Sequence, residues 1–242
     1  MRLFVVIPAY NAERHIQGVL QRIAALGETS AYVLTQVIVV DDGSRDATAT
    51  RVRESGFERC PLRLITRPQN GGYGAAMKDG LAAARLGDPD LVACVHADGQ
   101  YSPEALPSLC SALEMHGFDL LQGSRIAAGT ALAGGMPMYK FVANAVLNRI
   151  ENHTLALSLT DYHSGYLVYG RRALTLPFHS LSDSFDFDLE VIASARARSL
   201  AVGEAPIPTH YGDEVSHLNP LTYGLRVLRV MWNYRRGRYA AA

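Results

Sequence analysis

The sequence predicts an α/β fold: a mostly parallel, twisted sheet with helices on both faces. Short apolar segments alternate with segments of helical periodicity through the first half of the chain, and this alternation is typical of parallel strands joined by crossover helices. Glycine, proline, aspartate and asparagine cluster where the apolar segments end. The 242 residues are 48% hydrophobic and 19% charged, which is enough to bury the core of an ordered domain.

Five apolar segments are the predicted strands of the first half: 3–7, 36–40, 62–66, 91–95 and 119–122. Helices fit between them at 16–26, 45–55 and 73–85. Ser102, Pro103 and Glu104 predict a further helix start, with serine as the cap, proline at the first position and an acid in the first turn. The crossovers between parallel strands should be right-handed.

The second half carries a weaker pattern. Residues 127–138 are small and glycine-rich and predict a loop, and residues 206–220 predict a second, turn-rich segment. We expect helices at 138–151, 186–198 and 221–235, and a strand at 165–169.

Composition excludes several classes of protein. The 23 basic residues balance 23 acidic ones, so bulk charge gives no support to a nucleic-acid partner. Cys60, Cys94 and Cys110 are odd in number and lack the spacing of a zinc site or a disulfide framework, which favours reduced thiols in a cytoplasm. The N-terminal apolar segment is read as a core strand and not a signal peptide, and no run of about 18 apolar residues predicts a membrane-spanning helix.

Polar residues follow each predicted strand of the first half. The segments are PAYNAE, VDDGS, RPQNGGYGAAMKDG, HADGQY and GSR, in chain order. Carboxyl ends of parallel strands meet at one edge of the sheet, where open α/β folds bind their ligands. Each segment also has a structural explanation, because Asp-Gly and Asn-Gly pairs form turns and a histidine is often half-buried. Their coincidence at one edge favours a binding site.

The glycine-rich segment at 67–80 does not fit the common phosphate-binding motifs. It lacks the Gly-Lys-Ser/Thr of a Walker loop, and no GxGxxG follows the first strand. A simple NTPase and a dinucleotide-dependent dehydrogenase are therefore disfavoured.

These segments resemble the family 2 glycosyltransferases, which have the Rossmann-like type A glycosyltransferase fold. VVIPAYNAE, VVDDGSRD, RPQNGGYGAAMKDGL, HADGQY and GSR occur in the family's order over residues 3–125, and DYHSGYLVYGRRAL and FDFDLEVIASA extend the resemblance to about residue 210. Soluble polyprenyl-phosphate mannosyl- and glucosyltransferase-like members are the most similar. The resemblance implies a nucleotide-sugar-binding half at 1–125, an acceptor-side half at 126–215, and a C-terminal helix and tail at 216–242.

The resemblance also implies the site residues. Ala12 separates Asn11 from the acid that often follows directly in the family, and His96 stands at the first position of the family's Asp-x-Asp. The expected metal residues are Asp98, Gln100 and His96, with His96 either a ligand or an orienting neighbour. A nucleotide-diphosphate sugar is expected at Pro8, Tyr10, Glu13, Asp42, Asn70, Gly71 and Asp98.

The resemblance implies a chemistry of sugar transfer by single displacement, with inversion at the anomeric carbon. Mg²⁺ or Mn²⁺ on Asp98 would neutralise the charge that builds on the departing diphosphate, and Arg125 would pair with a phosphate. An alcohol acceptor needs a general base, for which Asp161 is the first candidate; Asp186, Asp188 and Glu190 are others. A phosphate acceptor is already anionic and needs none.

The acceptor is expected to be a polyprenyl phosphate, with a saccharide or another alcohol as the alternative. The segment 221–242 contains five arginines and no acid, and an amphipathic helix of this kind either rests on anionic lipid or packs on the protein or a second subunit. We therefore expect a cytoplasmic protein with a possible peripheral contact to the inner face of the membrane. A sugar-nucleotide pyrophosphorylase lacks support, since no basic glycine-rich loop follows the first strand. A non-catalytic sugar-nucleotide-binding protein and a homo-oligomer stay open.

Overall fold

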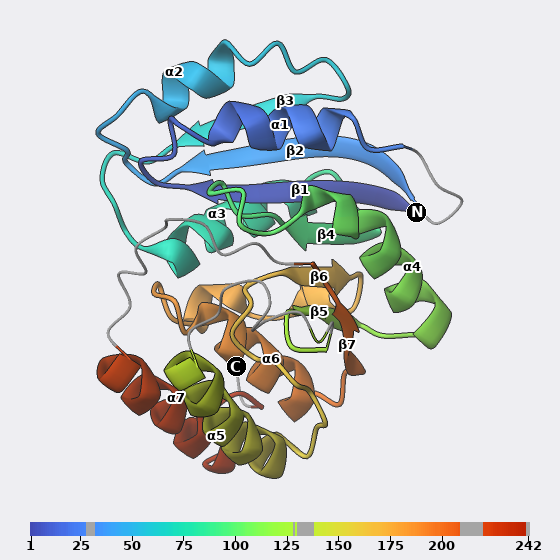
Figure 1. Ribbon diagram of the computed structural model, residues 1–242. Coiled ribbons are helices and arrows are strands. Elements are labelled where there is room, and N and C mark those ends of the chain that lie inside the picture. Colours follow the sequence, from blue (N-terminus) through green and yellow to red (C-terminus); the bar gives the residue numbers. More distant parts are fainter. Residues whose placement is uncertain (28–31, 128, 130–137, 209–219, 241–242) are drawn as a thin grey trace.

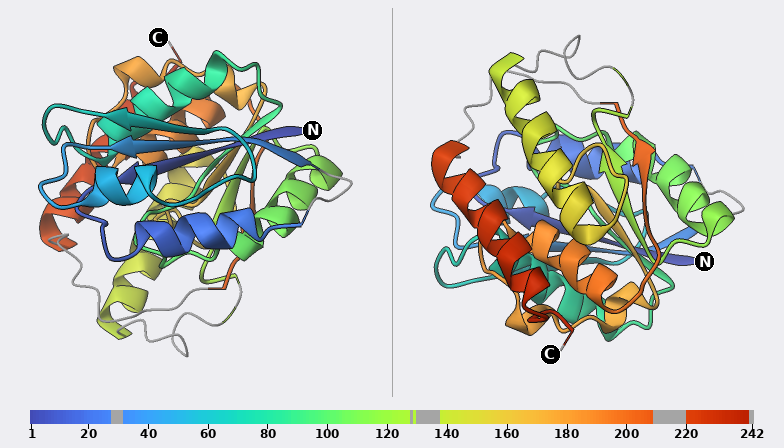
Figure 2. Two further views of the ribbon diagram at one scale, coloured as in Figure 1. Left: turned by 90° about the horizontal axis from the view of Figure 1, so that it is seen from above. Right: turned by 90° about the horizontal axis from the view of Figure 1, so that it is seen from below.

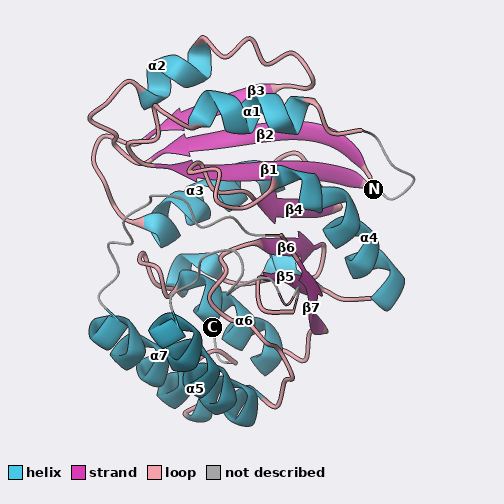
Figure 3. Cartoon of the chain, in the orientation of Figure 1, coloured by secondary structure: helices cyan, strands magenta, loops and turns pink. Residues whose placement is uncertain are grey.

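The computed structural model describes residues 1–27, 32–127, 129, 138–208 and 220–240. These residues form one twisted sheet in the order β3-β2-β1-β4-β6-β5-β7 (Figure 3). Strand β6 is antiparallel to its neighbours β4 and β5, and the other pairs are parallel. This confirms the predicted mostly parallel sheet. The strands are β1 (Arg2–Ala9), β2 (Val33–Asp41), β3 (Leu62–Thr66), β4 (Leu91–Cys94), β5 (Leu120–Ser124), β6 (Leu167–Gly170) and β7 (Val202–Pro206).

Helices cover both faces of this sheet, as the alternating pattern predicts (Figures 1 and 2). Helices α1 and α4 pack on one face, α3 and α6 pack on the other, and α7 lies against both α5 and α6. The α-helices are α1 (Ile16–Ala24), α2 (Thr48–Arg53), α3 (Tyr73–Arg85), α4 (Leu106–His116), α5 (Met138–Leu155), α6 (Phe187–Ala197) and α7 (Pro220–Arg235), and three short 3₁₀ helices span Pro103–Ala105, Ala173–Thr175 and Phe178–Ser180.

Side-chain alternation along β1 explains why the strand is apolar throughout. Leu3, Val5 and Ile7 enter the core under α1 and α4, whereas Phe4 and Val6 enter the core under α3 and α6. A strand with helices on both sides must be apolar at every position. Strand β1 is therefore a rigid arm in the middle of the sheet, and its carboxyl end carries Pro8 and Tyr10 to the sheet edge.

Two helix starts differ from the sequence prediction. Helix α2 begins at Thr48 and not at residue 45, because the Asp46 carboxylate accepts hydrogen bonds from the Thr48 amide (3.0 Å) and hydroxyl (2.5 Å) and holds the preceding residues in a turn. Ser102 stands at the N-cap position with Pro103 behind it, as predicted, but they begin a 3₁₀ turn that precedes α4, and the Ser102 hydroxyl donates to the Glu104 carboxylate instead of accepting from a backbone amide.

Other expectations have mixed outcomes. Strand β7 was not predicted, and the expected loops at 127–138 and 206–220 lie mostly outside the described residues. Cys60, Cys94 and Cys110 are free, as expected. Within the described part of the chain, no helix combines the length and the apolar character needed to cross a bilayer.

The packing of α3 on β1 yields a stability prediction. A Cβ at Gly80 would overlap Val6 Cγ1 and lie 3.2 Å from Val40 Cγ2, so Gly80→Ala should destabilise the fold by about 1–3 kcal/mol. Gly18 in α1 has no atom within 4 Å of the equivalent position, so Gly18→Ala should stabilise by about 0.5–1 kcal/mol through helix propensity. Urea denaturation measures both, and equal effects of the two substitutions would contradict this packing.

Candidate active site

A cleft opens at the carboxyl ends of β1 and β4, beside the first residue of α3. Its volume is about 170 Å³. Four residues predicted for the site line it together: Pro8, Tyr10, His96 and Asp98. The sequence interpretation missed the rest of the lining, which consists of Asn11, Ala12, His15, Tyr73 and Ala97.

Asp42 is buried behind the glycine turn and is not among the cleft-lining residues. Its Oδ1 accepts from Arg67 Nη1 (2.5 Å) and the Gly71 amide (3.0 Å), and its Oδ2 accepts from the Gly72 amide (2.9 Å). Asp42 therefore fixes the turn that leads into α3. Asn70 and Gly71, also predicted for nucleotide binding, are exposed on this turn.

The segments after β1 and β2 hold each other through reciprocal hydrogen bonds. The Asn11 amide donates to Ser44 Oγ (2.9 Å), and the Arg45 amide donates to Asn11 Oδ1 (2.9 Å). Glu13 Oε2 accepts from the Ala47 amide at the start of α2 (3.0 Å). The carboxylate of Glu13, a predicted nucleotide ligand, thus takes part in the hydrogen bonds between these two segments, and Glu13 is not among the cleft-lining residues.

The HADGQY segment crosses the floor of the cleft in a turn. Asp98 Oδ1 accepts from the Gln100 amide (2.9 Å), and Gly99 has a φ of 74° that favours glycine. His96 Nε2 lies 3.1 Å from the Gly165 carbonyl; a carbonyl only accepts, so Nε2 carries the proton. Arg22 and Glu104 brace the far side of the turn with Nη2–Oε2 and Nε–Oε1 distances of 2.7 and 2.9 Å.

These residues fit a cation shared with a substrate, not one held by protein alone. Among the described residues, no group of three or more histidine, cysteine or acidic side chains could hold a metal ion. Asp98 lines the cleft, whereas His96 Nε2 is turned to the Gly165 carbonyl and Gln100 contacts Asp98 through its main chain. One carboxylate suits Mg²⁺ or Mn²⁺, which take much of their coordination from water and substrate phosphates.

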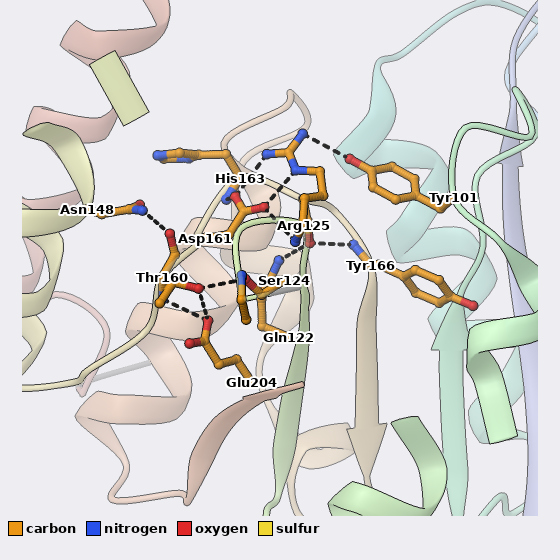
Figure 4. Close-up of polar contacts among 12 residues, drawn as sticks. Tyr101, Gln122, Ser124, Arg125, Asn148, Thr160, Asp161, His163, Tyr166 and Glu204 are labelled. Atoms are coloured by element: carbon orange, nitrogen blue, oxygen red, sulfur yellow. Dashed lines mark hydrogen bonds and ion pairs between the residues drawn. The ribbon is translucent and has the colours of Figure 1, made fainter. Parts of the chain in front are cut away.

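Arg125 and Asp161 form a buried, two-point ion pair at the end of β5 (Figure 4). Arg125 Nε lies 2.6 Å from Asp161 Oδ2, and Nη2 lies 2.9 Å from Oδ1. The third guanidinium nitrogen, Nη1, lies 3.4 Å from the hydroxyl of Tyr101. The Tyr101 ring packs edge-on against His96 with a centroid distance of 4.9 Å, so one aromatic side chain joins this pair to the cleft.

This geometry disfavours the general-base role predicted for Asp161. Burial alone would raise the pKa of its carboxyl, but the charge and hydrogen bonds of Arg125 outweigh burial and hold that pKa below its ordinary value. Both oxygens also already accept hydrogen bonds, including one from the His163 amide (3.1 Å). A weakly basic, fully occupied carboxylate is suited to holding Arg125 in place.

Asp188, unlike Asp161, has a carboxyl whose pKa is raised and not lowered by its surroundings. It is buried at the start of α6, and burial raises its pKa to about 7 although the hydroxyl of Tyr73 donates to Oδ2 at 2.8 Å. Tyr73 in turn lines the cleft. The other two acids considered are engaged elsewhere: Asp186 pairs with Arg226 (3.2 Å), and Glu190 accepts from Tyr239 (2.8 Å).

Comparison with known proteins places the chain. Residues 4–176 match the family described as Glycosyl transferase family 2. The chain belongs to glycosyltransferase family 2. This confirms the family inferred from the five strand-end motifs and makes the protein an enzyme of the glycosyltransferase class.

Relatives and solved structures agree with this assignment. The chain is 28% identical over 207 residues to dolichol-phosphate mannosyltransferase of Saccharomyces cerevisiae (84% of this chain, 75% of that protein). It is 27% identical over 209 residues to polyprenol monophosphomannose synthase of Mycolicibacterium smegmatis (85% and 76%). Its fold matches glucosyl-3-phosphoglycerate synthase of Mycobacterium tuberculosis, crystallised with Mn²⁺, UDP and phosphoglyceric acid, at a TM-score of 0.69 and 22% identity (96% of this chain, 78% of that one).

The burial of Asp188 predicts a pH-dependent stability. Its native pKa of about 7 lies above the unfolded value of about 3.9, so the native state retains a proton that the unfolded state has lost, and stability falls as pH rises from 4 to 7. Asp188→Asn should remove this dependence, which amounts to about 2–3 kcal/mol between pH 5 and pH 8. Urea denaturation at pH 5 and pH 8 measures it.

The exposed Asp183, which pairs with Lys78 (2.8 Å), provides the control. Asp183→Asn should follow the wild-type pH dependence. If Asp188→Asn also runs parallel to the wild type between pH 5 and pH 8, Asp188 is not a buried acid with a raised pKa.

Proposed function

We propose that the protein transfers a hexosyl group from a nucleotide-diphosphate sugar to a polyprenyl phosphate, in a metal-dependent single displacement with inversion. The observation that carries this proposal is the placement of Asp98 in the cleft, with Arg125 connected to the same cleft through Tyr101, whose hydroxyl contacts Arg125 and whose ring packs on His96. The first group suits a cation on a leaving diphosphate, and the second suits an acceptor phosphate. The names of the yeast and mycobacterial relatives support the same acceptor class.

On the donor side, the cleft would hold the nucleotide diphosphate between the β1 tip and the HADGQY turn. Pro8 and Tyr10 form one wall, and Asp98 faces it from β4. Mg²⁺ or Mn²⁺ bound at Asp98 would neutralise charge on the departing diphosphate. The solved neighbour that contains Mn²⁺ and UDP supports this use of the fold.

On the acceptor side, Arg125 would orient a phosphate and Asp161 would hold Arg125. The two-point pair leaves Nη1 as the guanidinium nitrogen directed toward Tyr101 and the cleft side. A phosphate monoester is anionic near neutral pH and can attack without a general base. Transfer to a phosphate therefore does not require Asp161 to act as a general base.

A saccharide or other alcohol is the second candidate acceptor, and Asp188 is the observation that favours it. A carboxyl with a pKa of about 7 is suited to accept a proton near neutral pH. It contacts the cleft through the Tyr73 hydroxyl. In this case transfer to an alcohol, but not to a phosphate, would require Asp188.

Removal of the Asp98 charge tests the donor side. Asp98→Asn keeps the size of the side chain and should lower kcat/KM at least 100-fold, because the cation loses its protein carboxylate when charge develops on the diphosphate. Transfer of radiolabelled sugar to a short polyprenyl phosphate, with a titration of Mn²⁺, measures this effect. Wild-type activity and metal dependence in the variant would refute the assigned role of Asp98.

The outer face of α5 and α7 is suited to rest on a membrane surface. It exposes Met138, Val142, Val146 and Ile150 at four-residue spacing on α5, and Leu225, Leu228 and Trp232 on α7. Arg229 and Arg235 are exposed on α7 and Arg236 is exposed directly after it, and the Arg236 guanidinium lies 5.7 Å from the Trp232 ring centroid. We propose that this basic, apolar face contacts anionic lipid, where a polyprenyl acceptor resides.

Vesicle flotation tests the membrane contact. The double substitution Arg229→Glu/Trp232→Ala should reduce binding to anionic vesicles at least tenfold, because it removes both an attractive charge and an exposed ring that would insert into the lipid interface. Arg53→Glu on α2, at the other side of the molecule (Figure 1), should leave binding unchanged. Failure of the wild-type protein to bind anionic vesicles would exclude this face as a membrane contact.

A further inference from the structure

A buried polar cluster behind Asp161 has no part in the chemistry described above. Glu151 of α5 is fully buried, and among the described residues neither of its carboxylate oxygens has a hydrogen-bond partner. Its ion-pair partner in this part of the chain is His163, whose Nε2 lies 3.4 Å from Glu151 Oε2. A buried carboxylate without compensation is strongly unfavourable, so this arrangement requires an explanation.

The second ring nitrogen of His163 contacts α7. Nδ1 lies 2.9 Å from the hydroxyl of Tyr223, and the two rings meet edge-on at a centroid distance of 5.3 Å. Burial raises the pKa of Tyr223, so its phenol is neutral, and its hydroxyl can accept from a protonated Nδ1 or donate to an unprotonated one. A doubly protonated imidazole suits both neighbours at once, because it donates from Nδ1 to Tyr223 and places a positive charge 3.4 Å from the Glu151 carboxylate, which a neutral ring would not supply.

His163 is also joined to the residue that holds Arg125. Its amide donates to Asp161 Oδ1, and its charge contributes, after that of Arg125, to the lowered pKa of Asp161. Figure 4 shows the His163 ring on the side of Asp161 opposite Tyr101. The cluster thus runs from α5 and α7 through His163 and Asp161 to Arg125.

We propose that His163 is a positioning residue: as an imidazolium paired with Glu151 and bonded to Tyr223, it fixes the Asp161–Arg125 pair in the orientation that receives the acceptor. The inference rests on the proposed acceptor role of Arg125. It assigns a function to the buried Glu151 carboxylate, which supplies the countercharge. It also makes α5 and α7, the two helices of the outer face, structural supports of the acceptor site.

Two measurements test this proposal. In the wild-type protein, ¹⁵N NMR of labelled histidine at pH 7 should show both ring nitrogens of His163 in the protonated range, and Glu151→Gln should shift the ring to a neutral tautomer pattern. In steady-state transfer assays with a polyprenyl phosphate, Glu151→Gln and His163→Gln should each raise the acceptor KM at least tenfold. The donor KM should change less than twofold.

Asn152→Ala is the matched control. Asn152 lies next to Glu151 in α5 and anchors the same loop through Leu159 (2.8 and 2.9 Å) and the Tyr162 hydroxyl (2.8 Å), and these side-chain hydrogen bonds go to neither His163 nor Asp161. It should lower the melting temperature and leave the acceptor KM within twofold. An acceptor KM that rises equally in Asn152→Ala would reduce His163 to a structural role and overturn the proposal.

The two hypotheses fail separately. A neutral His163 in the wild-type spectrum overturns the positioning role whatever the substrate is, and this spectrum does not depend on how well a variant folds. A wild-type enzyme that transfers no sugar to polyprenyl phosphate but does transfer to an alcohol overturns the proposed acceptor. In that event the spectrum and the KM for the alcohol decide the role of His163.

Discussion

The reciprocal hydrogen bonds between the segments after β1 and β2 are the constraint on which the candidate site depends. Three of the backbone amides that follow β1 donate to side chains of the segment after β2, with acceptors on Ser44, Asp46 and Thr48 at 2.9, 3.1 and 2.7 Å. Asn11 and Glu13 return two bonds in the opposite direction. A single hydrogen bond is worth about 1 kcal/mol, and the buried Ala12 amide would cost about 1–3 kcal/mol if it lost its acceptor on Thr48. The wall of the cleft is therefore held as a unit, and Asn11 keeps a φ of 50° within it.

From this wall, a continuous set of contacts reaches Arg125, the proposed acceptor-side residue. Asp98 and His96 lie opposite the β1 tip, Tyr101 packs on His96, and the Tyr101 hydroxyl meets Arg125. The antiparallel strand β6 makes this possible, because the segment that enters it, with Gly165 and Asp161, begins at the same sheet edge where β4 and β5 end. A Cβ at Gly165 would meet the His96 ring at 2.7 Å, so this close approach requires glycine. Asp98 and Arg125 are thus linked through one continuous set of contacts.

Sequence reasoning predicted the sheet, most of its helices and the cleft residues on β1 and β4, because strand ends in a parallel sheet converge by geometry alone. It did not predict which polar side chains would be occupied by hydrogen bonds to the protein's own backbone. Asp42 and Glu13 fit a nucleotide pocket by motif, yet their carboxylates bond backbone amides. Tyr73 was missed because it reads as an ordinary first residue of a helix. The Glu151–His163 pair joins residues 12 apart in the chain through tertiary packing, and no local pattern signals it.

The central claim is that a cation bound at Asp98 faces a nucleotide diphosphate in the cleft between β1 and β4. Anomalous diffraction at the manganese edge, from crystals grown with Mn²⁺ and a nucleoside diphosphate, tests it most directly. The account predicts a manganese peak at about 2.0–2.4 Å from an Asp98 carboxylate oxygen, with diphosphate oxygens completing the coordination beside Pro8 and Tyr10. A nucleotide bound elsewhere, or a manganese ion coordinated without Asp98, would contradict it.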